Sequence, residues 1–305
     1  MKILLYGSNG WIGSLYLQYM NTNHPNIEII IGNSRIDNDK ELEKEIINNF
    51  PTHIISFTGR THGVYDGVKI NTIDYLEKPG KLVENIRDNL YGPINLATIC
   101  DKYNIHFTYI GTGCIFNFDD DHPYEQEING FTENDLPNYF GSSYSIVKGF
   151  SDRIMKKYKN VLNLRIRMPI TSDINNRNFI YKIVNYQKIC SIKNSMTVLP
   201  EFFPIIYKMM NNKLSTTVNL VNPGLISHNE ILEMYKEIVD PDFTWNNFSI
   251  EEQAKILLSA RSNNYLDTTF LENNYPEILN IKDSVRNILI QYKNNVDKIK
   301  DNFLS

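Results

Sequence analysis

The stretch that decides the fold is KILLYGSNGWIG, residues 2–13. Its apolar start predicts a short buried strand, and a helical pattern follows its last glycine up to Met20. A glycine triplet alone is as often a plain turn, but its place between a strand and a helix favours a pyrophosphate cradle. The stretch therefore predicts a dinucleotide-binding loop made of Gly7, Ser8, Asn9, Gly10, Trp11, Ile12 and Gly13.

The rest of the chain extends this start into an alternating pattern of strands and helices. Further strands are expected at 28–32, 53–57, 106–112 and 161–168, and helical segments at 81–103 and 143–158. Such alternation predicts an α/β fold, a Rossmann-type doubly wound parallel sheet. The last third has a lone strand at 217–221 and short helices at 228–239 and 250–258, which suggest a smaller α/β cap. We therefore expect an NADP-binding domain over 1–166 and a mainly substrate-binding cap over 167–305, with some segments returning to the sheet.

Composition excludes several classes of function. The chain has 305 residues and a net charge of −4, without a basic block, so neither nucleic acid nor an anionic membrane is an expected partner. Its apolar runs fall short of the roughly 20 residues that a membrane helix needs. Its three cysteines and six histidines lack metal-ligand spacing, so we expect no metal and a reducing, cytoplasmic location.

The residues after the second and third strands indicate which cofactor the loop holds. Gly32-Asn33-Ser34-Arg35 has no acid at the strand tip to accept the ribose hydroxyls, and Asp37 comes slightly late. Ser34 and Arg35 suit a 2′-phosphate, which favours NADPH with NADH as the alternative, although Arg35 could also be a solvated surface arginine. The residues expected beside the cofactor after the third strand are Thr58, Gly59 and Arg60.

A tyrosine and a lysine four residues apart supply a candidate catalytic pair. Tyr144 and Lys148 lie in a predicted helix, so they share one face. We expect the ammonium to lower the phenol pKa, so that the phenol can exchange a proton with a carbonyl or alcohol. Thr112, at the end of the fourth strand, is expected to give a second hydrogen bond. A similar spacing at Tyr65 and Lys69 falls in a polar loop and is taken as a coincidence.

These features together resemble the extended short-chain dehydrogenase/reductases, and longer segments narrow the resemblance. They are similar to the bifunctional nucleotide-sugar 3,5-epimerase/4-reductases of rhamnose synthesis, from the N-terminus to about Ile281. Only the segment from His62 to Lys81 departs from that family's usual loop. The matching segments are TGCIF, YSIVKG, LRIRMPI, RNFIYKI, NSMTVL, NPGLISHNEILEMY, FTWNNFSIEEQAKIL and ARSNNYLD.

The resemblance implies a substrate, a reaction and a set of roles. The family acts on UDP-4-keto-6-deoxy-glucose, sometimes the dTDP form, and yields the L-rhamnose nucleotide. Tyr144 and Thr112 would hold the oxygen at carbon 4, and Lys148 would bind the nicotinamide ribose. Cys114 and Lys182 would act as acid and base at carbons 3 and 5, in either order. Cys114 lies two residues after Thr112, so we expect both side chains on one strand face. The implied substrate contacts are Asn178, Ser195, Met196 and Arg261.

Three other functions stay open at this stage. The chain could be a 4-keto reductase only, or a GDP-fucose-synthase-like epimerase/reductase. It could also be a non-catalytic dinucleotide-binding regulatory subunit, although the presence of Thr112, Tyr144 and Lys148 argues against that. Dimers are common among such enzymes, so a homodimer is the assembly we consider, without an identified interface.

Overall fold

The computed structural model describes residues 1–304 and the side chains of residues 1–299. The chain forms two compact units, each built from separate stretches of sequence. The assignment of cofactor binding to 1–166 and substrate binding to 167–305 stays a prediction. The first unit comprises Met1–Ile115, Leu136–Arg165 and Phe203–Val218; the second comprises Phe116–Asp135, Ile166–Phe202 and Asn219–Ser305.

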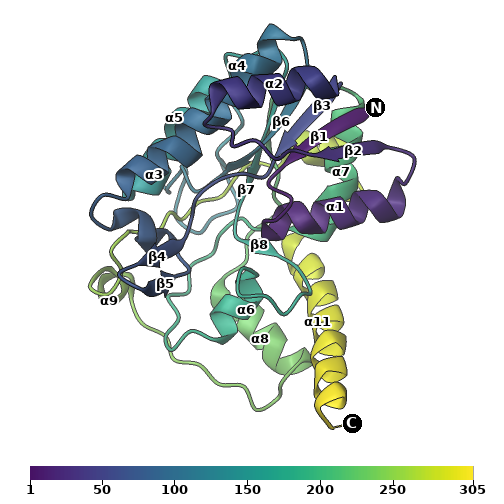
Figure 1. The fold of residues 1–305 in the computed structure, drawn as a ribbon. Coiled ribbons are helices and arrows are strands. Elements are labelled where there is room, and N and C mark those ends of the chain that lie inside the picture. Colours follow the sequence, from purple (N-terminus) through teal and green to yellow (C-terminus); the bar gives the residue numbers. More distant parts are fainter. Residues whose placement is uncertain (305) are drawn as a thin grey trace. The chain divides into compact units, whose positions relative to one another are not determined.

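The first unit is organised by a six-stranded sheet with the order β10-β7-β6-β3-β1-β2 (Figure 1). Strand β1 pairs in parallel with β2 on one side and with β3 on the other, so the strand order reverses there. Ligands of open α/β sheets bind at the carboxyl ends of the strands beside such a reversal. The predicted Rossmann-type fold is confirmed. The strands are β1 (Lys2–Tyr6), β2 (Glu28–Ile31), β3 (His53–Ser56), β6 (His106–Thr112), β7 (Val161–Ile166) and β10 (Thr217–Asn219).

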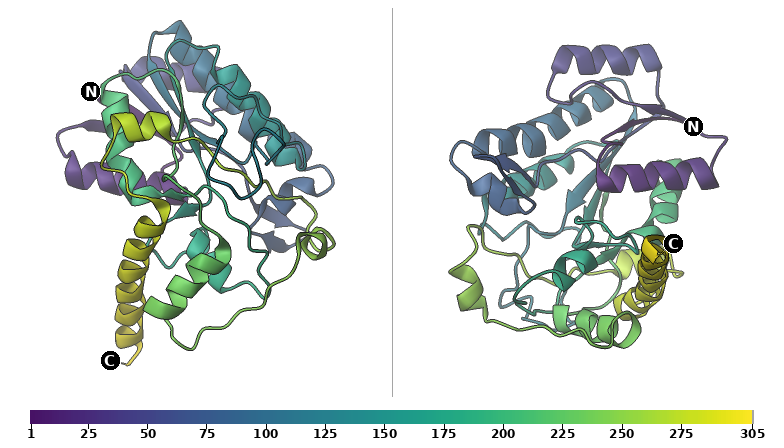
Figure 2. Two further views of the ribbon diagram at one scale, coloured as in Figure 1. Left: turned by 180° about the vertical axis from the view of Figure 1, so that it is seen from behind. Right: turned by 60° about the horizontal axis from the view of Figure 1, so that its bottom comes forward.

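Helices cover both faces of this sheet, because its strands are apolar on both sides. On one face, α2 (Asp39–Asn49), α4 (Gly92–Lys102) and α5 (Ser143–Met155) bury a cluster that includes Leu42, Leu96 and Met155. On the other face lies α1 (Trp11–Asn23), where Tyr16 packs against Phe57 and against Phe203 of α7 (Leu199–Asn211). Figure 2 shows α1 and α2 on opposite sides of the strands.

The boundaries of the predicted elements hold closely, with informative exceptions. The strand predicted at 106–112 is β6 to the residue, and α3 (Leu82–Ile86), a π-helical turn at Arg87–Tyr91 and α4 cover the predicted 81–103. The strand predicted to reach 168 ends at Ile166, because Met168 adopts a left-handed backbone with φ 40°.

The segment from 62 to 81, expected as a loop, has regular structure. Strands β4 (Gly63–Tyr65) and β5 (Val68–Ile70) form an antiparallel hairpin, followed by the 3-10 helix η1 (Ile73–Glu77). Its turn residues Asp66 and Gly67 both have positive φ, at 48° and 76°. An Asp-Gly pair is the usual sequence of such tight hairpin turns, so the signal was present in the sequence.

The second unit has its own apolar core. Helices α6 (Phe179–Val184) and α8 (His228–Ile238) pack with α11 (Ile281–Leu304), and Figure 2 shows α8 beside α11 in both views. A capping box between Ser227 and Glu230 starts α8 at the predicted residue. Within the residues that the structure describes, no helix is long and apolar enough to cross a membrane. The remaining elements are β8 (Pro169–Ile170), β9 (Thr197–Val198), α9 (Ile250–Ala254) and α10 (Thr269–Asn274).

Candidate active site

The glycine loop has the close-packed geometry that the sequence predicts. Gly7 has φ 83°, and its carbonyl accepts a hydrogen bond from Gly10 N at 3.0 Å. A Cβ on Gly13 would lie 2.2 Å from the Gly7 carbonyl oxygen, so the loop and the start of α1 touch as backbone. No side chain caps α1, whose N-cap is Gly10. The first-turn N–H groups therefore suit an anion such as a pyrophosphate.

The tip of β2 is held by one carboxylate. Glu45 accepts hydrogen bonds from the backbone N–H of Asn33 at 2.8 Å and of Ser34 at 3.1 Å. It also accepts one from the Tyr6 hydroxyl at 2.9 Å. The Ser34 hydroxyl donates to the Glu41 carbonyl at 3.2 Å. This turn therefore has a fixed shape, whereas the predicted contact of Ser34 with a phosphate stays a prediction.

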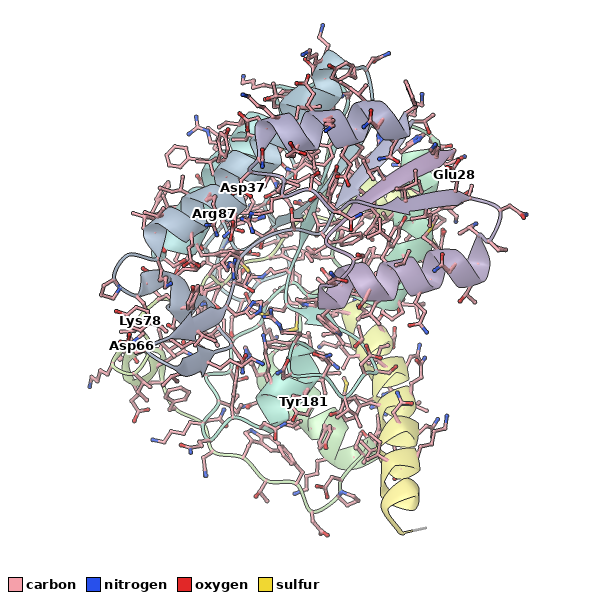
Figure 3. All side chains as sticks on the ribbon, viewed as in Figure 1. Glu28, Asp37, Asp66, Lys78, Arg87 and Tyr181 are labelled. Atoms are coloured by element: carbon pink, nitrogen blue, oxygen red, sulfur yellow. The ribbon has the colours of Figure 1, made fainter. Side chains whose placement is uncertain are left out.

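Arg35 belongs to a cluster of charges beside this tip. Its guanidinium lies 2.8 Å from Asp37 and 3.4 Å from Asp88, and its side chain is 60% exposed. Arg60 and Arg87 reach the same Asp88 at 2.9 Å and 2.7 Å, and Figure 3 labels Arg87 and Asp37 close together. Burial raises the pKa of Asp88, but its hydrogen bonds with Arg87 and Arg60 outweigh this and hold the pKa below its usual value. A surface cavity of about 490 Å³ is lined by Arg35, Asp37, Asn38, Asp39, Lys40 and Tyr91.

The predicted tyrosine–lysine pair lies at the start of α5. Ser142 caps this helix by accepting a hydrogen bond from Ser145 N at 3.1 Å. The next residue, Ser143, donates from its backbone N–H at 2.8 Å and from its hydroxyl at 2.9 Å to Glu77. The divergent segment thus anchors the end of α5 from which Tyr144 projects. The alternative pair, Tyr65 and Lys69, lies across the β4–β5 hairpin instead.

Tyr144 has a different electrostatic environment from the one that the sequence suggests. Burial raises its pKa above the usual value, and the nearby Cys114 raises it further. Only a hydrogen bond with the Thr112 hydroxyl lowers it. The expected lowering by Lys148 is absent. The lysine Nζ donates instead to the Tyr109 hydroxyl at 2.5 Å. Tyr144 is therefore a protonated phenol near neutral pH, which suits hydrogen-bond donation.

Lys148 is buried and has a carboxylate near it. Burial lowers its pKa to about 8, while Asp152 and Cys114 oppose this shift. Asp152 itself receives two hydrogen bonds from the buried Arg165, at 2.9 Å and 2.8 Å, and one from Asn163 at 2.7 Å. Sequence reasoning missed Asp152. Its signal was the spacing of 144, 148 and 152, which puts three ionisable groups on one helix face.

Thr112 and Cys114 are close together, but not for the reason expected. Strand β6 ends at Thr112, and Cys114 lies in the turn that follows. The prediction that both side chains share a strand face is therefore wrong. The Thr112 hydroxyl accepts a hydrogen bond from the Cys114 backbone N–H at 3.1 Å, which fixes the turn. Cys114 is half-buried and acts on the pKa of both Tyr144 and Lys148.

Lys182 lies on α6 in the second unit, among cations. Burial lowers its pKa to about 8, and Arg177 and Arg261 lower it as well. Asn178 is the N-cap of the same helix and accepts a hydrogen bond from Ile180 N at 3.2 Å. Its amide also donates to the Thr171 carbonyl at 2.8 Å, so it shapes the loop before α6.

The other predicted substrate residues are also engaged within the second unit. Ser195 is buried, and its hydroxyl accepts a hydrogen bond from Leu266 N at 2.9 Å. Met196 is buried in the apolar core. Arg261 donates to the Ser259 carbonyl at 2.9 Å. Their contacts with a substrate stay predictions. Among the described residues, no three histidine, cysteine or acidic side chains are grouped to hold a metal ion.

Comparisons with known proteins define the class to which this fold and site belong. Residues 3–174 match the NAD dependent epimerase/dehydratase family, and the chain belongs to that family. It is therefore an oxidoreductase/epimerase of the short-chain dehydrogenase/reductase fold, and the cofactor of its class is a nicotinamide dinucleotide.

Particular relatives make the comparison sharper. The crystal structure of a UDP-rhamnose synthase from Acanthamoeba polyphaga mimivirus is 49% identical, with a TM-score of 0.90, and the match covers 95% of this chain and 99% of that one. A bifunctional dTDP-4-dehydrorhamnose 3,5-epimerase/dTDP-4-dehydrorhamnose reductase of Arabidopsis thaliana is 42% identical over 93% of this chain and 91% of the plant protein. The resemblance drawn from the sequence motifs is confirmed.

Proposed function

We propose that this chain converts UDP-4-keto-6-deoxy-D-glucose to UDP-L-rhamnose, by 3,5-epimerisation followed by NADPH-dependent reduction of the 4-ketone. The observation that carries the proposal is the grouping of Thr112, Cys114, Tyr144 and Lys148 at the carboxyl end of β6. The proposal is also supported by a relative, 49% identical over nearly the whole chain, that is a UDP-rhamnose synthase.

The first task of the site is to stabilise negative charge at the oxygen on carbon 4. The ketone acidifies the protons on carbons 3 and 5, and their removal leaves an enolate. Tyr144 keeps its proton because burial raises its pKa, and it hydrogen-bonds with Thr112. Tyr144 therefore suits donation to that oxygen, and Thr112 would turn its hydroxyl to the same atom when the ketone is bound. Tyr144 is the group that would protonate the oxygen at the end of the reduction.

The second task is to move protons on carbons 3 and 5, which we assign to Cys114 and Lys182 on the strength of the family resemblance. The pKa of Lys182 is about 8, so its two protonation states are both accessible near neutral pH. A thiol serves as a base when it becomes a thiolate. Together the two side chains supply one acid and one base.

A bound NADPH would supply the hydride for carbon 4. The residues present fit a dinucleotide, because the Gly7–Gly13 contact leaves no room for a Cβ where a pyrophosphate needs backbone approach. Lys148 would bind the nicotinamide ribose, and Arg35 would bind the 2′-phosphate.

The choice of NADPH has its own test. We expect Arg35→Ala to weaken NADPH binding by roughly tenfold and NADH binding little, because a charge-assisted hydrogen bond to the 2′-phosphate is lost. Fluorescence titration of both cofactors measures this. Lys102→Ala is the matched control, since Lys102 is another exposed cation paired with an acid, Glu43, at 2.6 Å. Equal losses of affinity for NADPH and NADH would contradict the assignment of Arg35 to the 2′-phosphate.

The main experiment follows deuterium into the product. Wild-type protein is given UDP-4-keto-6-deoxy-glucose and NADPH in deuterated water, and NMR of the product shows where deuterium enters. We expect deuterium at carbons 3 and 5 of a rhamnosyl product. Cys114→Ala should slow this exchange by roughly 10²-fold or more, as removal of a general acid or base does. Cys190→Ala is the control, because Cys190 is a buried thiol of the second unit.

Each alternative gives a different result in the same experiment. Reduction of the ketone without exchange would indicate a 4-keto reductase only. Turnover of a GDP sugar in place of the UDP sugar would indicate fucose-type chemistry. If no NADPH is consumed with any of these sugars, the result favours the regulatory-subunit hypothesis. A dTDP substrate run in parallel sets the nucleotide preference.

A further inference from the structure

The lysine of the catalytic pair has a second phenol as its partner. Lys148 Nζ donates to the Tyr109 hydroxyl at 2.5 Å and lies 4.5 Å from the centre of the Tyr109 ring. The two residues are 39 positions apart in sequence, and both are buried, with exposed fractions of 5% and 1%. Tyr109 comes three residues before Thr112 on β6, so the strand's alternation turns it to the opposite face.

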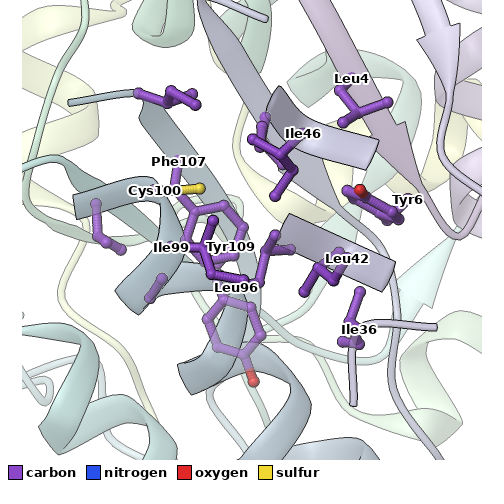
Figure 4. Packing of buried hydrophobic residues seen from close by; sticks show 14 of the residues in the cluster. Leu4, Tyr6, Ile36, Leu42, Ile46, Leu96, Ile99, Cys100, Phe107 and Tyr109 are labelled. Atoms are coloured by element: carbon purple, nitrogen blue, oxygen red, sulfur yellow. The ribbon is translucent and has the colours of Figure 1, made fainter. Parts of the chain in front are cut away.

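The surroundings of Tyr109 explain why its hydroxyl matters. Its ring packs in the apolar cluster with Leu96, Ile99 and Phe107, and Figure 4 shows its oxygen at the edge of that cluster. A buried hydroxyl without a partner costs free energy, whereas phenylalanine would fill the same space without that cost. Hydrogen bonds must therefore offset the cost of burying this hydroxyl, and one of these bonds comes from Lys148.

The oxygen of Tyr109 is itself held in place. It hydrogen-bonds with Ser151, one helical turn after Val147 on α5. The Ser151 hydroxyl in turn contacts the backbone carbonyls of Asn89 at 2.5 Å and Val147 at 3.1 Å. This chain ends on backbone oxygens, which do not take up a proton near neutral pH. Its chemistry is therefore that of an anchor and not of a proton relay.

We infer that Tyr109 is a positioning residue for the reaction: its hydroxyl, anchored through Ser151, holds the ammonium of Lys148 at the active site. The inference rests on the proposed role of Lys148 in that reaction. The other ionisable groups that act on Lys148 come from three elements. They are Asp152 of α5, Cys114 in the turn after β6, and Arg165 of β7 through its ion pair with Asp152.

The first test measures the effect of the Tyr109–Lys148 hydrogen bond in the absence of substrate. Lysine labelled with 13C at Cε is titrated by NMR, and the Lys148 signal is the one missing in Lys148→Met. A phenol oxygen that accepts from an ammonium stabilises the charged form, so Tyr109→Phe should move the titration midpoint of Lys148 to lower pH. Tyr16→Phe is the control, since Tyr16 is also buried and its hydroxyl donates to the Met210 sulfur at 3.5 Å. An unchanged midpoint in Tyr109→Phe would overturn the inference.

The second test reads the reaction. We expect Tyr109→Phe to lower kcat for the 4-keto reduction by roughly tenfold, the size of a lost hydrogen bond to a charged group. Ser151→Ala, which loosens the same phenol, should give a smaller loss. In Lys148→Met, adding Tyr109→Phe should cost nothing more, because the group that Tyr109 positions is already gone.

The outcomes separate this inference from the proposed function. A full tenfold loss on top of Lys148→Met would show that Tyr109 acts on folding or packing, and would overturn the inference. If the wild type does not convert the UDP sugar at all, the proposed function fails, while the NMR titration still decides whether Tyr109 holds Lys148. Thermal unfolding of each variant confirms that kinetic losses come from folded protein.

Discussion

The two lysines assigned to the reaction have similarly lowered pKa values, but their charged neighbours act in opposite directions. Lys148 and Lys182 are each brought to a pKa of about 8, mainly by burial. The neighbours of Lys148, Asp152 and Cys114, push its pKa back up. The neighbours of Lys182, Arg177 and Arg261, push its pKa further down. One lysine therefore lies among groups that favour its ammonium, and the other among groups that favour its neutral amine.

This difference is consistent with the two roles proposed for these lysines. Lys148 donates a short hydrogen bond to a fixed phenol, which suits a residue that binds and orients. Lys182 instead lies near Arg177 and Arg261, whose charges lower its pKa. An anion bound by Arg177 or Arg261 would raise the pKa of Lys182, because the repulsion that lowers it would be screened. Similar pKa values thus do not imply the same function.

The largest expected effect comes from removing each lysine in turn. Lys182→Met should slow deuterium exchange at the ring carbons by roughly 10²- to 10⁴-fold, because an acid or base is lost. It should leave reduction of the already epimerised 4-keto sugar nearly intact. Lys148→Met should do the reverse. NMR of deuterium incorporation measures the exchange step, and NADPH absorbance measures the reduction step. If both variants lose both steps equally, the two lysines do not have separate roles.

The dependence of stability on pH is a second and smaller effect. Both lysines have folded-state pKa values near 8, below the usual value of about 10.4, so the unfolded chain binds more protons between these pH values. Stability should therefore gain a positive contribution between about pH 8 and pH 10, of at most about 1.4 kcal/mol per pH unit for each lysine. Urea unfolding across this range measures it. Each lysine-to-methionine variant should reduce the slope of the unfolding free energy against pH. An unchanged slope in both variants would contradict the lowered pKa values of the two lysines.

The smallest expected effect concerns the cations around Lys182. Arg177→Gln should raise the pKa of Lys182, since one repelling charge is removed, and move the pH profile of exchange to higher pH. The rate at pH 7 should change severalfold. Arg153→Gln, in the last turn of α5, is the matched control. A profile that shifts equally in the control would mean that Arg177 has no specific influence.

Much of the fold could be predicted because its signals are local. The strand 2–6 and the glycine spacing lie within a dozen residues, and the left-handed Gly7 is required by the turn itself. Tyr144 and Lys148 could be paired from their spacing because helix geometry fixes which residues share a face. The Asp66–Gly67 turn was equally local, and it was missed because the segment around it is polar and lacks a long alternating pattern.

The sequence by itself determined the Rossmann-type sheet, the dinucleotide loop and the candidates Thr112, Tyr144, Lys148 and Cys114, since short-range geometry and motif resemblance carry them. Only the tertiary structure decided how these groups behave. It brought the Tyr109 hydroxyl, 39 residues away in sequence, into hydrogen-bonding contact with Lys148 and paired Arg165 with Asp152. It also raised the pKa of Tyr144 by burial, so that the phenol stays protonated. The physical reason is that a pKa depends on desolvation and on neighbouring charges. Both are set by which distant segments pack together, and no local pattern encodes that.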